Sequence, residues 1–184
     1  MAGIRQVKGE IRVLGIAVKP SRSGDLLNVV GVVFRGRRWL DGVMKATAQD
    51  PDVTDRLVEM IASSPHQPQI RVLLVDDSLV EGGAVIDAHR LSEKASRPVI
   101  RLTAEKGAPP SEADAEASSQ RFVLEREAGS RSVLSIGLRS RDAARVLEVS
   151  TREGLVPEAL RVAGLVASAV ADAPSVTFKR HFRI

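Results

Sequence analysis

The stretch that decides the fold is Glu10-Ile11-Arg12-Val13-Leu14-Gly15-Ile16-Ala17-Val18. Polar and apolar residues alternate in its first half, and its second half is continuously apolar. Alternation with a period of two indicates a β-strand, and a continuous apolar run indicates a strand with both faces covered. Residues 10–18 are therefore predicted to form a central strand of a sheet.

The next two apolar runs, at residues 27–34 and 39–48, are predicted to continue this sheet as a meander. Both contain β-branched or aromatic residues, and they are separated by Arg35-Gly36-Arg37-Arg38. Gly36 can adopt the positive φ that a tight hairpin requires. The hairpin is also basic, because the other residues of this linker are arginines.

Helices and strands are expected to alternate after the hairpin. Val53, Leu57, Val58 and Ile61 recur at helical spacing behind Asp52, which is a residue type that caps helix N-termini. The further expected elements are a strand at 70–75, a helix at 84–94 and a strand at 98–103. Strands that alternate with helices imply a parallel portion of sheet covered by those helices.

The last part of the chain is predicted to begin irregularly and then to form more strands and helices. Residues 104–120 combine Gly, Pro, Ser, Ala and acidic residues, so an irregular segment is expected there. Strands are expected at 121–127 and 132–138, and helices at 140–149 and 159–171. Pro157 and Glu158 suit the first turn of the last helix, where proline's missing N–H costs no hydrogen bond.

Length and composition predict a single folded domain over residues 1–184. The chain is 43% hydrophobic and 27% charged, which are ordinary globular values. It has no cysteine, which excludes disulfides, thiol nucleophiles and thiolate metal sites, and its three histidines follow no ligand spacing. No apolar run approaches the roughly 18 residues that span a bilayer, so we expect a cytoplasmic protein without membrane contact.

Charge is segregated along the chain, although the net charge is only +4. Residues 1–40 and 129–184 are basic, whereas residues 41–128 are acidic. Such segregation fits a surface that attracts phosphate next to carboxylates that could hold a cation. The alternative is that the arginines are merely scattered over a solvated surface.

Four blocks of the sequence together resemble one archaeal family, domain of unknown function 99, which is itself similar to endonuclease V. The blocks are Arg12-Val13-Leu14-Gly15-Ile16, Val29-Val30-Gly31-Val32-Val33-Phe34-Arg35-Gly36, Trp39-Leu40-Asp41-Gly42-Val43 and Pro157-Glu158-Ala159-Leu160-Arg161-Val162-Ala163. The resemblance implies an α/β, RNase H-like fold: an antiparallel three-strand meander, then parallel strands, in one mixed sheet flanked by helices. For active members it implies metal-dependent cleavage of DNA or RNA with Mg²⁺ or Mn²⁺.

Metal-dependent cleavage requires carboxylates that converge on one point, because Mg²⁺ prefers oxygen ligands and activates water beside the scissile phosphate. In the family these carboxylates come from the first strand, the entrance to the first helix and the end of the fourth strand. The resemblance therefore implies Asp76 and Asp52 as catalytic residues, with Asp50 as an alternative to Asp52. Asp76, Asp77 and Asp41 are the candidate metal ligands. The alternatives are that Asp52 only caps a helix and that Asp76 and Asp77 only bind loop N–H groups.

The first strand departs from the family pattern. Family members usually read Gly-Ile-Asp-Asp where this chain has Gly15-Ile16-Ala17-Val18, so both expected carboxylates are missing. The leading hypothesis is a nucleic-acid-associated, endonuclease V-like domain with a degenerate nuclease site, which binds or recruits, for example in DNA repair or processing. The alternatives are an active endonuclease with a rearranged carboxylate site, and a scaffold that contacts a protein partner.

Arg35, Arg37 and Arg38 are predicted to contact nucleic acid. Three cations within four residues at an exposed turn are what a phosphate contact requires, although solubility charges would look the same. Trp39 is expected to pack in the core or on a face of the sheet rather than stack on a base, because the chain has one tryptophan, four phenylalanines and no tyrosine.

Overall fold

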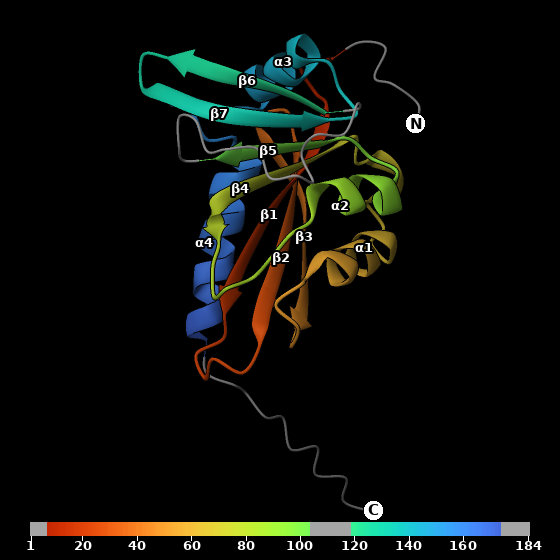
Figure 1. The fold of residues 1–184 in the computed structure, drawn as a ribbon, viewed down its shortest axis with the longest axis vertical. Helices are drawn as coiled ribbons and strands as arrows, with labels where there is room; N and C mark the ends of the chain where they lie inside the picture. The colour runs from red at the N-terminus through yellow and green to blue at the C-terminus, as the bar shows by residue number, and fades with distance from the viewer. Residues whose placement is uncertain (1–6, 104–118, 174–184) are drawn as a thin grey trace, which may run out of the picture.

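The computed structural model describes residues 7–103 and 119–173, which form one mixed β-sheet with helices against both faces (Figure 1). Within these residues the sheet has seven strands in the order β3-β2-β1-β4-β5-β7-β6. The strands are β1 (Arg12–Pro20), β2 (Leu27–Arg35), β3 (Trp39–Ala48), β4 (Val72–Val80), β5 (Val99–Thr103), β6 (Ser119–Arg126) and β7 (Gly129–Ile136). The helices are α1 (Thr54–Ala62), α2 (Ala88–Ala95), α3 (Ser140–Ser150) and α4 (Glu158–Asp172), with a 3₁₀ turn at Gln67–Gln69.

The strand directions confirm the predicted meander followed by parallel strands. β1 pairs antiparallel with β2, and β2 pairs antiparallel with β3. β1 pairs parallel with β4, and β4 pairs parallel with β5. β7 then returns antiparallel beside β5, and β6 pairs with β7 at the edge of the sheet. The arginine-rich hairpin between β2 and β3 has its glycine, Gly36, at a φ of 58°, as the sequence predicts.

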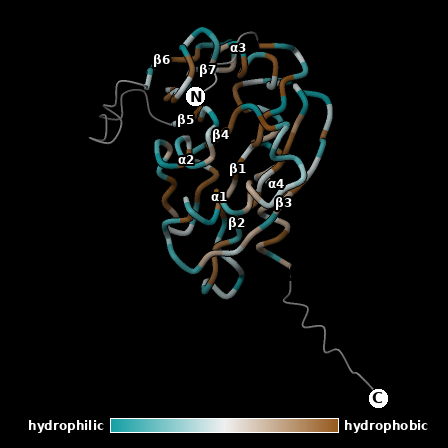
Figure 2. Tube along the Cα trace, turned by 90° about the vertical axis from the view of Figure 1, so that its right-hand side faces the viewer, coloured by the Kyte–Doolittle hydropathy of each residue, from teal (hydrophilic) through white to brown (hydrophobic). Residues whose placement is uncertain are grey.

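β1 is the central strand that its apolar sequence predicts. Leu14, Ile16 and Val18 belong to an apolar cluster on the face that α1 and α2 cover. Val13 and Ala17 belong to a second cluster on the face that α3 and α4 cover. All five side chains are fully buried. Figure 2 shows hydrophobic residues along the central strands, while the outer loops are mostly hydrophilic.

α4 lies so close to β1 that a glycine is required between them. A Cβ added at Gly15 would lie 2.3 Å from the carbonyl carbon of Ala159 and 2.6 Å from the backbone nitrogen of Leu160. The absence of a side chain lets the two backbones approach to this extent. This contact joins the first and last of the four blocks that carry the family resemblance.

The largest differences from the predicted bounds are at the end of β4 and the start of α2, and the other strand ends move by at most three residues. β4 continues to Val80 instead of ending at residue 75, so the two acidic residues that follow its apolar run lie within the strand. α2 begins at Ala88 instead of residue 84, because the Asp87 carboxylate accepts a hydrogen bond from the Arg90 backbone N–H and caps the helix there. The irregular segment expected at 104–120 lies outside the described residues except for its last two, which begin β6.

Among the described residues, none of the helices has the length and apolar character that a membrane crossing needs.

Candidate functional site

Asp76 lies where β4 separates from β1. The register between these two strands shifts between Ile16 and Val18, so that residues 76–79 of β4 oppose Ala17 alone. A bulge of this kind re-aims side chains, and bulges are common next to functional sites. The bulge therefore positions Asp76 beside the place on β1 where the family pattern has a carboxylate and this chain has Ala17.

Asp76 points to the face of the sheet that α4 covers. On β5 it is opposite Leu102, a member of the apolar cluster that also contains Ala17. The Asp76 side chain is only 1% exposed, and it forms an ion pair with Arg131 of β7. Its Oδ1 accepts hydrogen bonds from the Ser78 backbone N–H at 3.0 Å and from the Ser78 hydroxyl at 2.7 Å. This buried carboxylate is thus neutralised by a guanidinium and held by a serine.

Asp77 points to the opposite face, because neighbouring residues of a strand alternate in direction. Its carboxylate accepts a hydrogen bond from the Arg101 Nε at 2.7 Å, and the two side chains are 35% and 33% exposed. Both line a hollow of about 360 Å³ together with Val75, which belongs to the cluster under α1 and α2. The structure therefore does not bring Asp76 and Asp77 to a common point.

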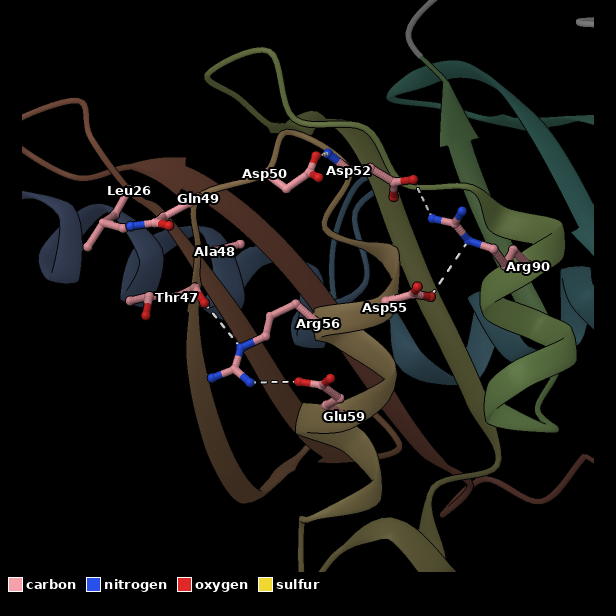
Figure 3. Close-up of a pocket in the computed structure, with 10 residues that line it drawn as sticks. All are labelled: Leu26, Thr47, Ala48, Gln49, Asp50, Asp52, Asp55, Arg56, Glu59 and Arg90. Carbon is pink, nitrogen blue, oxygen red and sulfur yellow. Dashed lines mark hydrogen bonds and ion pairs between the residues drawn. The ribbon is translucent and has the colours of Figure 1, made fainter.

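Asp52 lies at the entrance to α1, as the sequence predicts, and lines a hollow of about 550 Å³ (Figure 3). Its carboxylate accepts a hydrogen bond from the Thr54 backbone N–H at 3.1 Å and forms an ion pair with Arg90 of α2. The prediction that Asp52 is the N-cap is wrong by one residue: the N-cap is Val53, and Asp52 binds the first N–H of the helix. Asp50 accepts a hydrogen bond from the Asp52 N–H at 2.8 Å.

These contacts favour the ionised form of Asp52. Hydrogen bonding from Thr54 and then the guanidinium of Arg90 lower its pKa from the usual value, against the opposing effect of partial burial. α1 and α2 supply all of these groups, so Asp52 is bound on the face of the sheet opposite to Asp76.

Asp52→Asn is expected to lower the free energy of unfolding at about pH 7 by at most about 1 kcal/mol, the usual upper value for an exposed ion pair. Because the folded-state pKa is lowered, this stabilisation is complete above the unfolded-state pKa of about 3.9 and is lost as the pH falls through the folded-state value. Urea unfolding curves of parent and variant should therefore differ near pH 7 and converge in acid. A difference that does not change with pH would contradict a role for the charge.

Asp41 lies at the other end of β1 from Ala17. Its carboxylate is 2.7 Å from Arg12 Nε and 3.6 Å from Arg35 Nη2. Arg12 is the first residue of β1 and pairs with Arg35 of β2. Ala17 is five residues along the strand from Arg12, which corresponds to roughly 16 Å. The structure therefore keeps Asp41 away from Asp76.

Arginines are the partners that the sequence analysis misses. Each of the four candidate acids is ion-paired with at least one: Asp41 with Arg12 and Arg35, Asp52 with Arg90, Asp76 with Arg131, and Asp77 with Arg101. Within the described residues, no three acidic or histidine side chains come together as a group that could hold a metal ion. A divalent metal needs several free oxygen donors, so the arrangement around Asp76 does not fit Mg²⁺ or Mn²⁺.

The hairpin arginines do not behave as one group. Arg35 is half-buried and faces Asp41, whereas Arg37 and Arg38 are exposed at the tip of the hairpin. Trp39 does not lie in the core, because its side chain is 57% exposed. Among the described residues β3 is an edge strand, and Trp39 is its first residue, next to the exposed tip of the hairpin.

The fold belongs to the endonuclease V-like, RNase H-like class. Endonuclease V from Bacillus subtilis superposes with a TM-score of 0.60 at 11% identity, covering 86% of this chain and 78% of that one. Ciona intestinalis endonuclease V, in complex with an inosine-containing DNA, gives 0.59 at 11% identity, covering 86% and 84%. A protein of unknown function from Archaeoglobus fulgidus gives 0.69 at 22% identity, covering 88% and 99%.

Within this class the chain belongs to the Endonuclease dU family, whose model matches residues 9–171. A UPF0215 protein from Methanothermobacter thermautotrophicus is 37% identical over an alignment 186 positions long, which covers 90% of each chain. The Pyrococcus horikoshii UPF0215 protein is 34% identical over 185 residues, covering 91% of this chain and 95% of that one. The family resemblance found in the sequence is thus confirmed, and the relatives named here are archaeal.

Proposed function

We propose that this chain binds nucleic acid through its endonuclease V-like fold and has lost metal-dependent cleavage. The observation that carries this proposal is the buried ion pair between Asp76 and Arg131. In this pair the Arg131 guanidinium lies against Asp76, the fourth-strand carboxylate for which the family resemblance implies a catalytic role.

A guanidinium cannot replace a metal ion in phosphodiester hydrolysis. It neutralises a carboxylate and binds phosphate, but it does not generate hydroxide from a bound water at neutral pH, as a metal does. A divalent ion at Asp76 would meet a carboxylate already bound by Arg131 and Ser78. It would also be repelled by the guanidinium, and the buried methyl group of Ala17 would offer it no second oxygen.

Kinship and charge both support nucleic acid as the partner. The family bears the name Endonuclease dU, and one structural neighbour was solved with an inosine-containing DNA. The chain is basic overall, and its exposed cations include Arg37 and Arg38 at the tip of the β2–β3 hairpin. We infer a binding or recruiting role on nucleic acid, such as in DNA repair or processing.

The test is binding and cleavage measured on the same labelled oligonucleotides. The set contains single-stranded and duplex DNA with one deoxyuridine, with one deoxyinosine or without damage, and a matched RNA. Fluorescence anisotropy is expected to show binding that requires neither Mg²⁺ nor Mn²⁺ and persists in EDTA. Denaturing gels are expected to show uncut strands in every condition.

Two outcomes would overturn the proposal. Metal-dependent cleavage that Asp52→Asn or Asp77→Asn abolishes would identify an active endonuclease with a rearranged carboxylate site. Absence of binding to every oligonucleotide would instead favour a protein-interaction scaffold, because such a scaffold never needs to meet nucleic acid.

A further inference from the structure

Two hollows meet where the β2–β3 hairpin approaches α3. One, of about 700 Å³, is lined by β6 and α3, and the other, of about 350 Å³, is lined by the hairpin and α3. Arg145 and Glu148 of α3 line both hollows, so they form one continuous surface. Besides Arg35, which faces Asp41, six arginines line this arginine surface: Arg37, Arg38, Arg126, Arg139, Arg141 and Arg145.

The arginine surface holds more positive charge than its own carboxylates neutralise. Within α3 and its N-cap, Arg139 is paired with Asp142 at 2.9 Å and Arg145 with Glu148 at 2.6 Å. The third acidic residue that lines the hollows is Glu10. Among the described residues, no carboxylate forms an ion pair with any of three exposed arginines: Arg37, Arg38 and Arg141.

The cations converge on Glu148 from three elements. Its pKa is lowered mainly by the hydrogen bond and charge of Arg145, and the charges of Arg126 from β6 and Arg37 from the hairpin lower it further. The geometry agrees, because Arg126 lines the larger hollow together with Glu148 and Arg37 lines the smaller one together with it. Phosphate oxygens, which are also anionic acceptors, suit the same surroundings.

The arginine surface also reaches toward the buried pair at β4. Leu124 lines the larger hollow and is directly opposite Arg131 in the pairing of β6 with β7. Opposite residues of antiparallel strands have Cα atoms about 4.5–5.5 Å apart. A ligand in the larger hollow thus lies next to the strand that holds Arg131.

We infer that the arginine surface binds the phosphodiester backbone of a nucleic-acid strand. This inference rests on the proposed nucleic-acid binding and assigns it to the groove between the hairpin, β6 and α3, beyond the three hairpin arginines that the sequence indicates. Guanidinium groups bind phosphate and carboxylate oxygens alike through paired N–H donors, so the choice of a nucleic-acid strand over an acidic peptide rests on the kinship with the Endonuclease dU family. Glu148 opposes the strand because its carboxylate competes for Arg145.

The first test removes the three exposed arginines that carry no ion pair. The variant Arg37→Ala/Arg38→Ala/Arg141→Ala is compared with Arg22→Ala/Lys45→Ala/Arg71→Ala, which removes three exposed cations outside the two hollows. Each phosphate contact contributes about 0.7–0.9 to the slope of log affinity against log salt. The slope for a labelled DNA strand should therefore fall by about 2–3 in the first variant and remain near the parent value in the control.

The second test predicts stronger DNA binding instead of weaker binding. A substitution that merely disturbed the structure would not strengthen binding. Glu148→Gln should tighten DNA binding, because it removes the carboxylate that competes with phosphate. The matched control is Glu59→Gln in α1, since Glu59 is paired with Arg56 at the same helical spacing and 2.7 Å, and is 65% exposed against 60% for Glu148. Binding by this control should be unchanged.

The other possible results of these binding experiments would contradict either the arginine surface or the proposed nucleic-acid binding. Equal loss of slope in both triple variants, or no tightening by Glu148→Gln, would overturn the arginine surface while the proposed nucleic-acid binding stands. If the parent binds no DNA or RNA at all, the proposed function itself fails. If poly-glutamate of matched charge displaces DNA as well as unlabelled DNA does, the surface recognises charge alone and the assignment to nucleic acid is wrong.

Discussion

Asp76→Asn is expected to lower the free energy of unfolding by about 3–5 kcal/mol, the usual cost of breaking a buried ion pair from one side. Asp76 is 1% exposed and Arg131 is 17% exposed, so the variant leaves a guanidinium poorly solvated and without its counter-charge. Urea unfolding followed by circular dichroism measures the loss. Arg131→Met should cost a similar amount, because it leaves the carboxylate uncompensated.

The double variant Asp76→Asn/Arg131→Met should recover much of this loss, since it removes both charges together. The neighbouring pair on the other face of the sheet is the matched control. Asp77 and Arg101 are 35% and 33% exposed, so Asp77→Asn should cost less than about 1 kcal/mol. Equal losses for Asp76→Asn and Asp77→Asn would show that burial does not distinguish the two pairs.

The central position of β1 could be predicted from the sequence. A strand that is buried on both faces needs apolar residues at consecutive positions, and β1 has such a run. The hairpin could also be predicted, because its turn needs a residue with positive φ and the sequence has a glycine, Gly36, at that place. β4 was harder. Its apolar run ends at Val75, but the strand continues because backbone pairing with β5 reaches Asp76 and pairing with β1 resumes at Val80, whatever the side chains.

The ion pairs that bind the candidate acids could not be predicted from the sequence. Asp77 and Arg101 are 24 positions apart, and Asp76 and Arg131 are 55 apart, so each pair depends on the order of strands in the sheet. A partial signal was present in β5, Val99–Thr103, where Arg101 interrupts an apolar run. A charge in such a strand needs a partner, although the sequence does not say which one.

The exposure of Trp39 also depends on the order of the strands in the sheet, which the sequence does not state. Among the described residues β3 is the outermost strand on its side, and Trp39 stands at its start beside the exposed hairpin tip. Local composition predicted a packed aromatic residue, and sheet order decided otherwise.

The double variant Ala17→Asp/Arg131→Ser is expected to make folding stability depend on Mn²⁺. Ala17 is fully buried on the face that Asp76 occupies, so the first substitution adds the missing carboxylate and the second removes the competing guanidinium. Without metal, two buried carboxylates repel each other and the variant should be strongly destabilised. At about 100 times Kd, metal binding to the folded state should restore about 2.7 kcal/mol. In thermal melts this corresponds to a rise in Tm of roughly 5–10 °C.

The matched control is Ala17→Asn/Arg131→Ser, which has the same side-chain size at position 17 and one carboxylate fewer. Its Tm should change little with Mn²⁺, and so should that of the parent, in which Arg131 remains bound to Asp76. If the Ala17→Asp double variant is too unstable to fold alone, refolding in Mn²⁺ should still recover it. Equal metal response in both double variants, or none in a folded Ala17→Asp double variant, would show that position 17 and Asp76 do not face one another. The missing carboxylate at position 17 could then not explain why this chain differs from a metal-dependent nuclease.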